Sequence, residues 1–156
     1  MVRLTLTDFR GYRFLRLETD LRPVVLTGPN GAGKTNILEA ISFLAPGRGL
    51  RRARLSEVAR REAGEGAPWG VAAAMRQGEG GHDLATGRDA GSERRLVRID
   101  GQTARSQAAL GEIWGMVWLT PAMDRLFTEG AAGRRRFLDR LVLGFDPAHA
   151  GRASAY

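Results

Sequence analysis

The chain has 156 residues, a formal net charge of +7 and no cysteine, and this length suits one domain with a core of its own. The absence of cysteine excludes a disulfide framework, a zinc–cysteine site and a thiol nucleophile, and it favours a reducing, cytoplasmic setting. No stretch approaches the ~20 apolar residues of a membrane span, so we expect no membrane contact.

The first part of the chain is expected to place two strands and a helix around a glycine-rich loop. Apolar and polar residues alternate over residues 2–7, which predicts a half-buried strand, and a second strand is expected over 14–19. Residues 23–27, Pro-Val-Val-Leu-Thr, are apolar and β-branched, which predicts a strand covered on both faces of a central sheet. Helical spacing of apolar residues predicts a helix over 34–45 that ends at Pro46.

The second part is expected to alternate strands, glycine-rich turns and short helices. Three strands should form an antiparallel patch, over residues 69–76, 84–86 and 95–99. Helical segments are expected over residues 55–59, 106–110 and 131–143, and a further buried strand over 113–119. Together these elements predict an α/β fold with a mixed central sheet and an antiparallel β patch.

The loop of residues 28–35, Gly-Pro-Asn-Gly-Ala-Gly-Lys-Thr, matches the phosphate-loop pattern between a predicted strand and a predicted helix. Its glycines let successive backbone N–H groups converge on a phosphate, and the helix aims its positive dipole end at the same anion. Lys34 can reach the β and γ oxygens, and the Thr35 hydroxyl can ligate Mg²⁺. We therefore predict a site for ATP and Mg²⁺, with nucleotide contacts from Gly28, Pro29, Asn30, Gly31, Ala32, Gly33, Lys34, Thr35 and Asn36.

Lys34 is the single lysine among 24 basic residues; the other 23 are arginine. It stands where a compact ammonium group is needed and a planar guanidinium would be too bulky. Arginine is thus the default cation of this chain, and its clusters are weak evidence for nucleic-acid binding. Backbone contact with DNA and a solvated surface remain alternatives for three clusters: residues 48, 51, 52 and 54; residues 94, 95 and 98; and residues 134–136.

Three separated segments carry a family resemblance. The loop continues into Asn36-Ile-Leu-Glu-Ala-Ile41, and the chain opens with Leu6-Thr-Asp-Phe-Arg-Gly-Tyr12. With the loop, these resemble the head domains of the ABC-type ATPases of DNA maintenance, the SMC, Rad50 and RecF group. Residues 118–130, followed by Arg134-Arg-Arg-Phe-Leu-Asp139, resemble the signature of the RecF branch.

The resemblance implies a head domain that binds ATP·Mg²⁺ and forms a homodimer around it. It implies a mediator of DNA repair, replication and the SOS response, which binds single-strand gaps or junctions in DNA. Such a protein helps to load recombinase at stalled forks with RecO and RecR partners. It also implies that Arg10 lies near the nucleotide and contacts a phosphate, and that Tyr12 lies near the base or ribose. A polar turn between two strands is the alternative for both residues.

Two elements of an ABC-type ATPase do not occur in the sequence: an apolar strand ending in Asp-Glu, and a Ser-x-Gly signature. We therefore expect residues 1–156 to be the N-terminal part of a head domain, with the rest of the head and an arm lobe beyond the chain end. We expect no catalytic residue within the chain. Weak DNA-dependent ATPase activity would then belong to the full-length dimer, and the fragment alone would be inactive.

Two other protein classes share the phosphate loop. An ABC transporter ATPase subunit normally continues the loop with Ser/Thr-Leu, whereas Asn36-Ile-Leu-Glu-Ala follows it here. A small-molecule kinase would need a lid and an acceptor pocket, for which the sequence has no recognisable segment. Both classes stay open as alternatives to the DNA-repair function.

Overall fold

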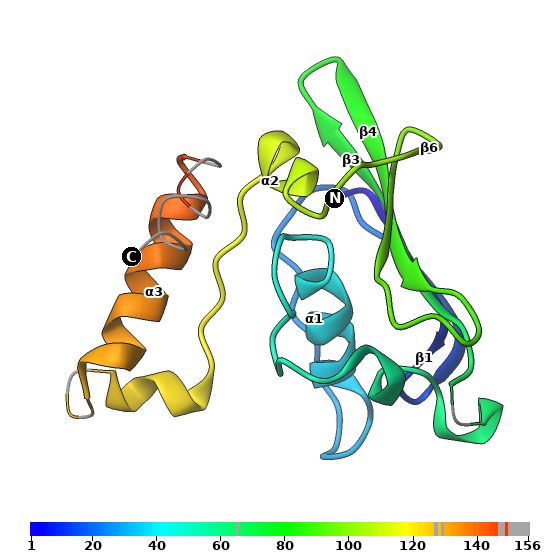
Figure 1. Ribbon diagram of the computed structural model, residues 1–156, viewed down its shortest axis with the longest axis horizontal. Helices are drawn as coiled ribbons and strands as arrows, with labels where there is room; N and C mark the ends of the chain where they lie inside the picture. The colour runs from blue at the N-terminus through cyan, green and yellow to red at the C-terminus, as the bar shows by residue number, and fades with distance from the viewer. Residues whose placement is uncertain (65, 127, 129, 147–148, 150–156) are drawn as a thin grey trace. The chain divides into compact units, whose positions relative to one another are not determined.

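A computed structural model describes residues 1–64, 66–126, 128, 130–146 and 149 (Figure 1). The chain divides into two units, Met1–Leu110 and Gly111–Tyr156. The first unit contains a β-sheet with helix α1 against one of its faces, and the second contains helix α3.

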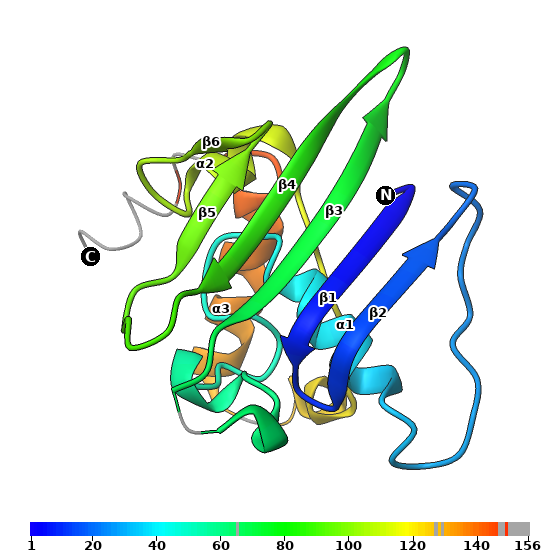
Figure 2. The same cartoon turned by 90° about the vertical axis from the view of Figure 1, so that its right-hand side faces the viewer.

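The sheet of the first unit has six strands in the order β2-β1-β3-β4-β5-β6 (Figure 2). These strands are β1 Arg3–Phe9, β2 Tyr12–Glu18, β3 Trp69–Gln77, β4 Gly80–Arg88, β5 Leu96–Ile99 and β6 Gln102–Thr103. Every pairing is antiparallel, so the antiparallel patch is confirmed, and the mixed sheet is wrong for the described residues. The early strands and the patch form one sheet because β1 pairs with β3, with Leu6 opposite Val71.

The core lies between one face of the sheet and α1. Alternate strand residues are buried there, namely Leu4, Leu6, Trp69, Val71, Ala73, Leu84 and Val97, and Ala40 and Leu44 cover them. Three aromatic rings pack at the end of α1: the ring centroids of Phe43 and Trp69 are 5.1 Å apart, and Phe9 lies 5.7 Å from Trp69 and 6.0 Å from Phe43. This cluster stabilises the packing of α1 on β1 and β3, because such aromatic pairs contribute about 0.5–1.5 kcal/mol beyond their buried area.

The predicted strand over residues 23–27 is wrong. The segment has no strand assignment, and Val24 and Val25 are 53% and 82% exposed. A buried strand needs hydrogen-bonded neighbours along its edges, and no described strand pairs with this segment. The apolar, β-branched composition therefore marks a segment that is able to pair but has no partner in the described chain.

The helices agree with the predictions to different degrees. Helix α1 spans Lys34–Ser42, three residues shorter than expected, and α3 spans the expected Ala131–Leu143. Helix α2 covers Ala109–Ile113, so it overlaps the predicted helix in two residues only. Three short 3₁₀ turns are also present: η1 Leu55–Glu57, η2 Arg61–Ala63 and η3 Pro121–Arg125.

The strand predicted over residues 113–119 is also wrong. Residue 113 ends α2, and residues 114–119 have no regular secondary structure. A short apolar run does not by itself distinguish a strand from other buried segments.

No helix in the described part of the chain is long and apolar enough to cross a membrane.

Arg95 binds the C-terminal end of α1. Its guanidinium donates hydrogen bonds to the carbonyl groups of Phe43, Ala45 (3.2 Å) and Gly47 (2.7 Å), and its Nε donates to Thr86 Oγ1 at 2.8 Å. Burial lowers the pKa of Arg95 to about 10, which still leaves the group charged at neutral pH. A cation at this position compensates the negative end of the helix dipole. Arg95 is therefore a structural residue and not a free cation for DNA.

Replacing Arg95 with methionine should lower the free energy of unfolding by about 2–3 kcal/mol, because the part-buried carbonyl groups of Phe43 and Ala45 lose a charged donor. Urea unfolding of the full-length protein, followed by tryptophan fluorescence, measures this loss. Arg94 is the matched control, since its side chain is exposed, and Arg94→Met should change stability by less than about 0.5 kcal/mol. Equal effects of the two substitutions would contradict the helix-end role of Arg95.

Candidate functional site

The predicted phosphate loop leads directly into α1. Gly28, Gly31 and Gly33 have φ angles of 141°, 85° and 94°, a region that side chains disfavour. Among the described residues, the N–H groups of Gly31, Gly33, Lys34 and Thr35 have no hydrogen-bond acceptor. The helix begins without a side-chain cap and without an acidic residue in its first turn, so nothing compensates its positive end. These unpaired donors suit a phosphate group.

Lys34 folds back over the loop. Its Nζ donates hydrogen bonds to the carbonyl oxygens of Gly28 at 2.5 Å and Pro29 at 2.8 Å. An ammonium group has three donors, so this contact holds Lys34 at the mouth of the loop with one donor left. The arrangement keeps the cation beside the unpaired N–H groups, where an anion would meet both.

Thr35 follows at an exposed position. No group of three or more His, Cys, Asp or Glu side chains suited to a metal ion occurs among the described residues. Mg²⁺ commonly takes one or two protein oxygens and completes its shell with phosphate oxygens and water. Thr35 is therefore the candidate ligand for a metal held together with a nucleotide.

The turn between β1 and β2 lies along the start of α1. The Tyr12 hydroxyl is 3.5 Å from the carbonyl oxygen of Ala32, and a Cβ atom on Gly33 would lie 2.4 Å from that hydroxyl. One residue earlier, Gly11 lies beside the Asn36 side chain, whose Nδ2 would be in ordinary contact, at 3.7 Å, with a Cβ there. The turn thus touches the end of the loop and the first turn of the helix.

Arg10 lies in the same turn, and its guanidinium is already bound to protein oxygens. Nε and Nη2 donate to the two carboxylate oxygens of Glu39 at 2.9 and 2.6 Å, and Nη1 donates to the carbonyl oxygen of Glu57 at 2.7 Å. The structure therefore brings Arg10 next to α1 but directs its side chain at Glu39. Contact of Arg10 with a phosphate stays a prediction.

Glu39 is the site residue that sequence reasoning missed. Its side chain is fully buried, and its Oε2 also accepts a hydrogen bond from Arg51 Nη1 at 2.9 Å. The same Arg51 nitrogen donates to Asn36 Oδ1 at 3.1 Å. A sequence signal existed, because Glu39 lies one helical turn before the buried Phe43, where an apolar residue is expected.

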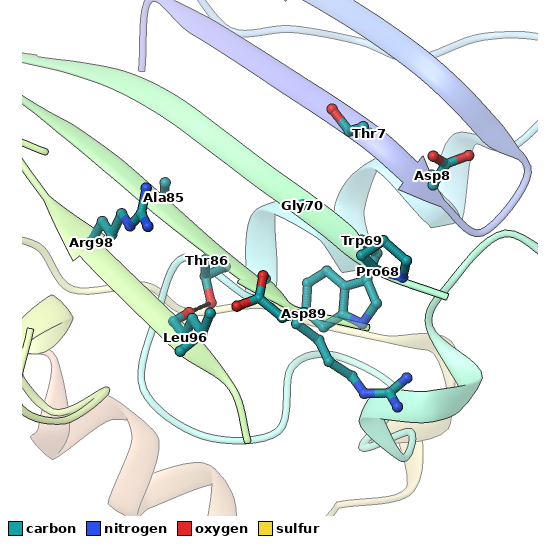
Figure 3. A pocket seen from close by; sticks show the side chains of 12 residues that line it. Thr7, Asp8, Pro68, Trp69, Gly70, Ala85, Thr86, Asp89, Leu96 and Arg98 are labelled. Atoms are coloured by element: carbon teal, nitrogen blue, oxygen red, sulfur yellow. Dashed lines mark hydrogen bonds between the residues drawn. The ribbon is translucent and has the colours of Figure 1, made fainter. Parts of the chain in front are cut away.

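A hollow of about 290 Å³ lies on the outer face of the sheet (Figure 3). It forms where Thr7, Gly70, Gly87 and Leu96 stand in register across four strands, because the two glycines leave a gap between larger side chains. No phosphate-loop residue lines this hollow. Its volume is at the lower limit of small-molecule pockets, so the phosphate loop is the better functional candidate.

A glycine-rich phosphate loop at the start of a helix is an arrangement that binds phosphate groups in nucleotide-binding proteins. Residues 3–107 match the AAA domain family, and the chain belongs to that family.

Along its whole length the chain is similar to the DNA replication and repair protein RecF. It is 53% identical to RecF of Rhizobium meliloti (strain 1021) and 51% identical to RecF of Caulobacter vibrioides, with all of this chain aligned. The chain spans 42% and 41% of the length of these curated relatives. The resemblance to RecF that the sequence motifs predicted is therefore confirmed for this part of the protein.

Solved structures give the same result for the fold. Structures of the recombination mediator protein RecF, described as RecF-ATPrS and RecF-ATP in the RecFOR pathway, match with TM-scores of 0.81 and 0.79. Each covers 93% of this chain at 23% sequence identity, and this chain spans 38% and 39% of those chains. The head-domain fold is thus shared. The sequence identity is higher with RecF of Rhizobium meliloti, at 53%, than with either solved structure, at 23%.

Alanine substitutions in the loop should show how closely Tyr12 packs. Gly31→Ala should cost about 1–2 kcal/mol of unfolding free energy because of its positive φ alone, since a Cβ there meets nothing within 4 Å. Gly33→Ala should cost about 1 kcal/mol more, because it also displaces Tyr12. Urea unfolding measures both. In a Tyr12→Ala background the two costs should become equal; a persistent difference would disprove the contact.

Proposed function

We propose that the phosphate loop of this chain binds ATP together with Mg²⁺. The observation that carries this proposal is the set of unpaired N–H groups at the start of α1, with Lys34 held beside them. Bound Mg²⁺ would supply charge neutralisation at the phosphate oxygens. Gly31, Gly33, Lys34 and Thr35 would supply backbone donors, Lys34 would pair with the β and γ oxygens, and Thr35 would hold the metal.

We further propose that the whole protein is a RecF-type recombination mediator of the cytoplasm. The similarity to RecF over the full chain supports this role, and it leaves the transporter and kinase alternatives without support. In this proposal an ATP-dependent homodimer binds single-strand gaps or junctions in DNA and works with RecO and RecR to load recombinase. Weak DNA-dependent ATP hydrolysis would belong to the complete dimer, and no residue of this chain is proposed as its catalytic base.

The loop after α1 carries exposed cations that suit the phosphates of a DNA backbone. Arg48, Arg52 and Arg54 are exposed, whereas Arg51 is paired with Glu39 and Arg95 with the end of α1. Contacts from such side chains neutralise phosphates without reading sequence. We therefore propose salt-dependent, sequence-independent binding through this loop.

The nucleotide proposal is tested with Lys34→Ala. Loss of a charge-assisted contact worth about 1.5–3 kcal/mol should weaken ATP binding by about 10–100-fold, measured by titration of the full-length protein with a fluorescent ATP analogue in the presence of Mg²⁺. Arg22→Ala removes the same charge from an exposed side chain paired with Asp20, and it should leave affinity within about twofold. Unchanged affinity of Lys34→Ala would refute the cofactor assignment.

The DNA proposal is tested by binding of the full-length protein to gapped duplex DNA over a salt series. ATP should tighten binding, and the slope of log K against log[salt] should be about −0.9 for each phosphate neutralised. Lys34→Ala should abolish the ATP effect and retain the salt-dependent basal binding. If ATP leaves binding to gapped DNA unchanged in the unsubstituted protein, the mediator role is wrong.

A further inference from the structure

We propose that Glu39 is a positioning residue of the nucleotide site, an inference that rests on the proposed binding of ATP. Glu39 does not reach the loop itself. Its carboxylate instead binds Arg10 from the β1–β2 turn and Arg51 from the loop after α1. Glu39 thereby holds two segments, distant in sequence, at the first two turns of the helix that presents the phosphate loop.

The first segment is the β1–β2 turn, which runs along the first two turns of α1. Tyr12 lies against Gly33, Gly11 lies beside Asn36 three residues further along, and Arg10 forms a bidentate pair with Glu39 after three more residues. A bidentate guanidinium–carboxylate pair fixes direction as well as distance. Without this pair, the turn that places Tyr12 on the loop would lose its polar attachment to the helix.

The second segment reaches the residue directly after the loop. Arg51 Nη1 joins Glu39 Oε2 to Asn36 Oδ1, and Asn36 follows Thr35, the candidate metal ligand. The Arg51 side chain is 42% exposed and Glu39 is fully buried, so the carboxylate is the fixed member of the pair. Glu39 therefore also sets where Asn36 and Arg51 stand beside the loop.

Further backbone contacts show that these segments form one assembly. The N–H of Arg10 donates to the carbonyl oxygen of Val58 at 2.9 Å, and the N–H of Arg60 donates to that of Asp8 at 2.8 Å. Arg60 also pairs with the Asp8 carboxylate at 2.9 Å. The β1–β2 turn is thus bound to the chain after α1 on one side and to Glu39 on the other.

Simple electrostatics argues against a carboxylate at this place. Negative charge near a triphosphate site lowers the affinity for a polyanion, and a buried carboxylate needs charged partners to be tolerated at all. Attraction of the anion therefore does not explain Glu39. Its geometry does, because one acceptor with two oxygens meets two guanidinium groups at once.

The charge effect and the positioning effect of Glu39 predict opposite changes in ATP affinity, so one substitution distinguishes them. Glu39→Gln keeps the size of the side chain and removes one negative charge. If net charge alone mattered, the variant would bind ATP·Mg²⁺ more tightly. If Glu39 positions the site, the full-length variant should bind at least about 10-fold more weakly, at both low and high salt, in titrations with a fluorescent ATP analogue. Unchanged or tighter binding would overturn the inference.

The variant Arg95→Met distinguishes a positioning effect on ATP binding from a general loss of stability, because it weakens the packing at the opposite end of α1. Both variants are compared well below their unfolding midpoints. Arg95→Met should keep the affinity of the unsubstituted protein within about threefold, and an equal loss in the two variants would overturn a positioning role. Nucleotide binding by the unsubstituted protein, and its loss in Lys34→Ala, show independently whether the proposed function stands.

If Glu39→Gln does not fold, Arg51→Met provides the second test. This substitution removes a half-exposed side chain and leaves the Arg10–Glu39 pair in place. Arg94→Met is its matched control, since it also removes an exposed arginine. The positioning role predicts at least about fivefold weaker ATP binding for Arg51→Met and less than about twofold for Arg94→Met. Equal effects would show that only net charge matters and would overturn the inference.

Discussion

The two ends of helix α1 need opposite hydrogen-bond partners: acceptors at the start and donors at the end. The described strands and loops differ in how they meet these two needs. A helix leaves unpaired N–H groups at its start and unpaired carbonyl groups at its end. Here backbone N–H groups pair with the last carbonyl groups of the helix, and the guanidinium of Arg95 binds the carbonyl groups of Phe43, Ala45 and Gly47 just beyond it. The start has neither a side-chain cap nor an acidic side chain. Among the described residues, the end of α1 with unpaired N–H groups is the one that carries the phosphate loop.

The antiparallel sheet provides the rigid surface on which this helix is mounted. The ring cluster of Phe9, Phe43 and Trp69 fixes the far end of α1, and the β1–β2 turn follows its near end. Glu39 lies between these two contacts and is the polar link between the turn, the helix and the loop after it. Its cost as a buried carboxylate is offset by two guanidinium groups, which explains why it is tolerated inside the core.

The elements that could be predicted are those whose signal is local. The phosphate loop, β1 and α3 were recognisable because glycine spacing, alternation and helical periodicity are properties of neighbouring residues. The strand prediction for residues 23–27 was wrong because an apolar, β-branched sequence shows only that a segment can form a strand. A strand also needs a neighbouring strand for its backbone hydrogen bonds, and the described chain has none there. Arg95 shows the same limit: it belonged to an apparent surface cluster, yet it is buried against carbonyl groups about 50 residues earlier in the chain.

The sequence by itself determined the phosphate loop, the likeness to RecF and the composition that excludes thiol chemistry. All of these depend on the identity and spacing of residues along the chain. Only the tertiary structure decided that Arg10 points at Glu39, that Arg51 reaches Asn36 and that the six strands form one antiparallel sheet. These are contacts between distant residues, and their formation depends on how the segments fold together. A side chain's partners are therefore fixed by packing, whereas its chemical capacity is fixed by its type.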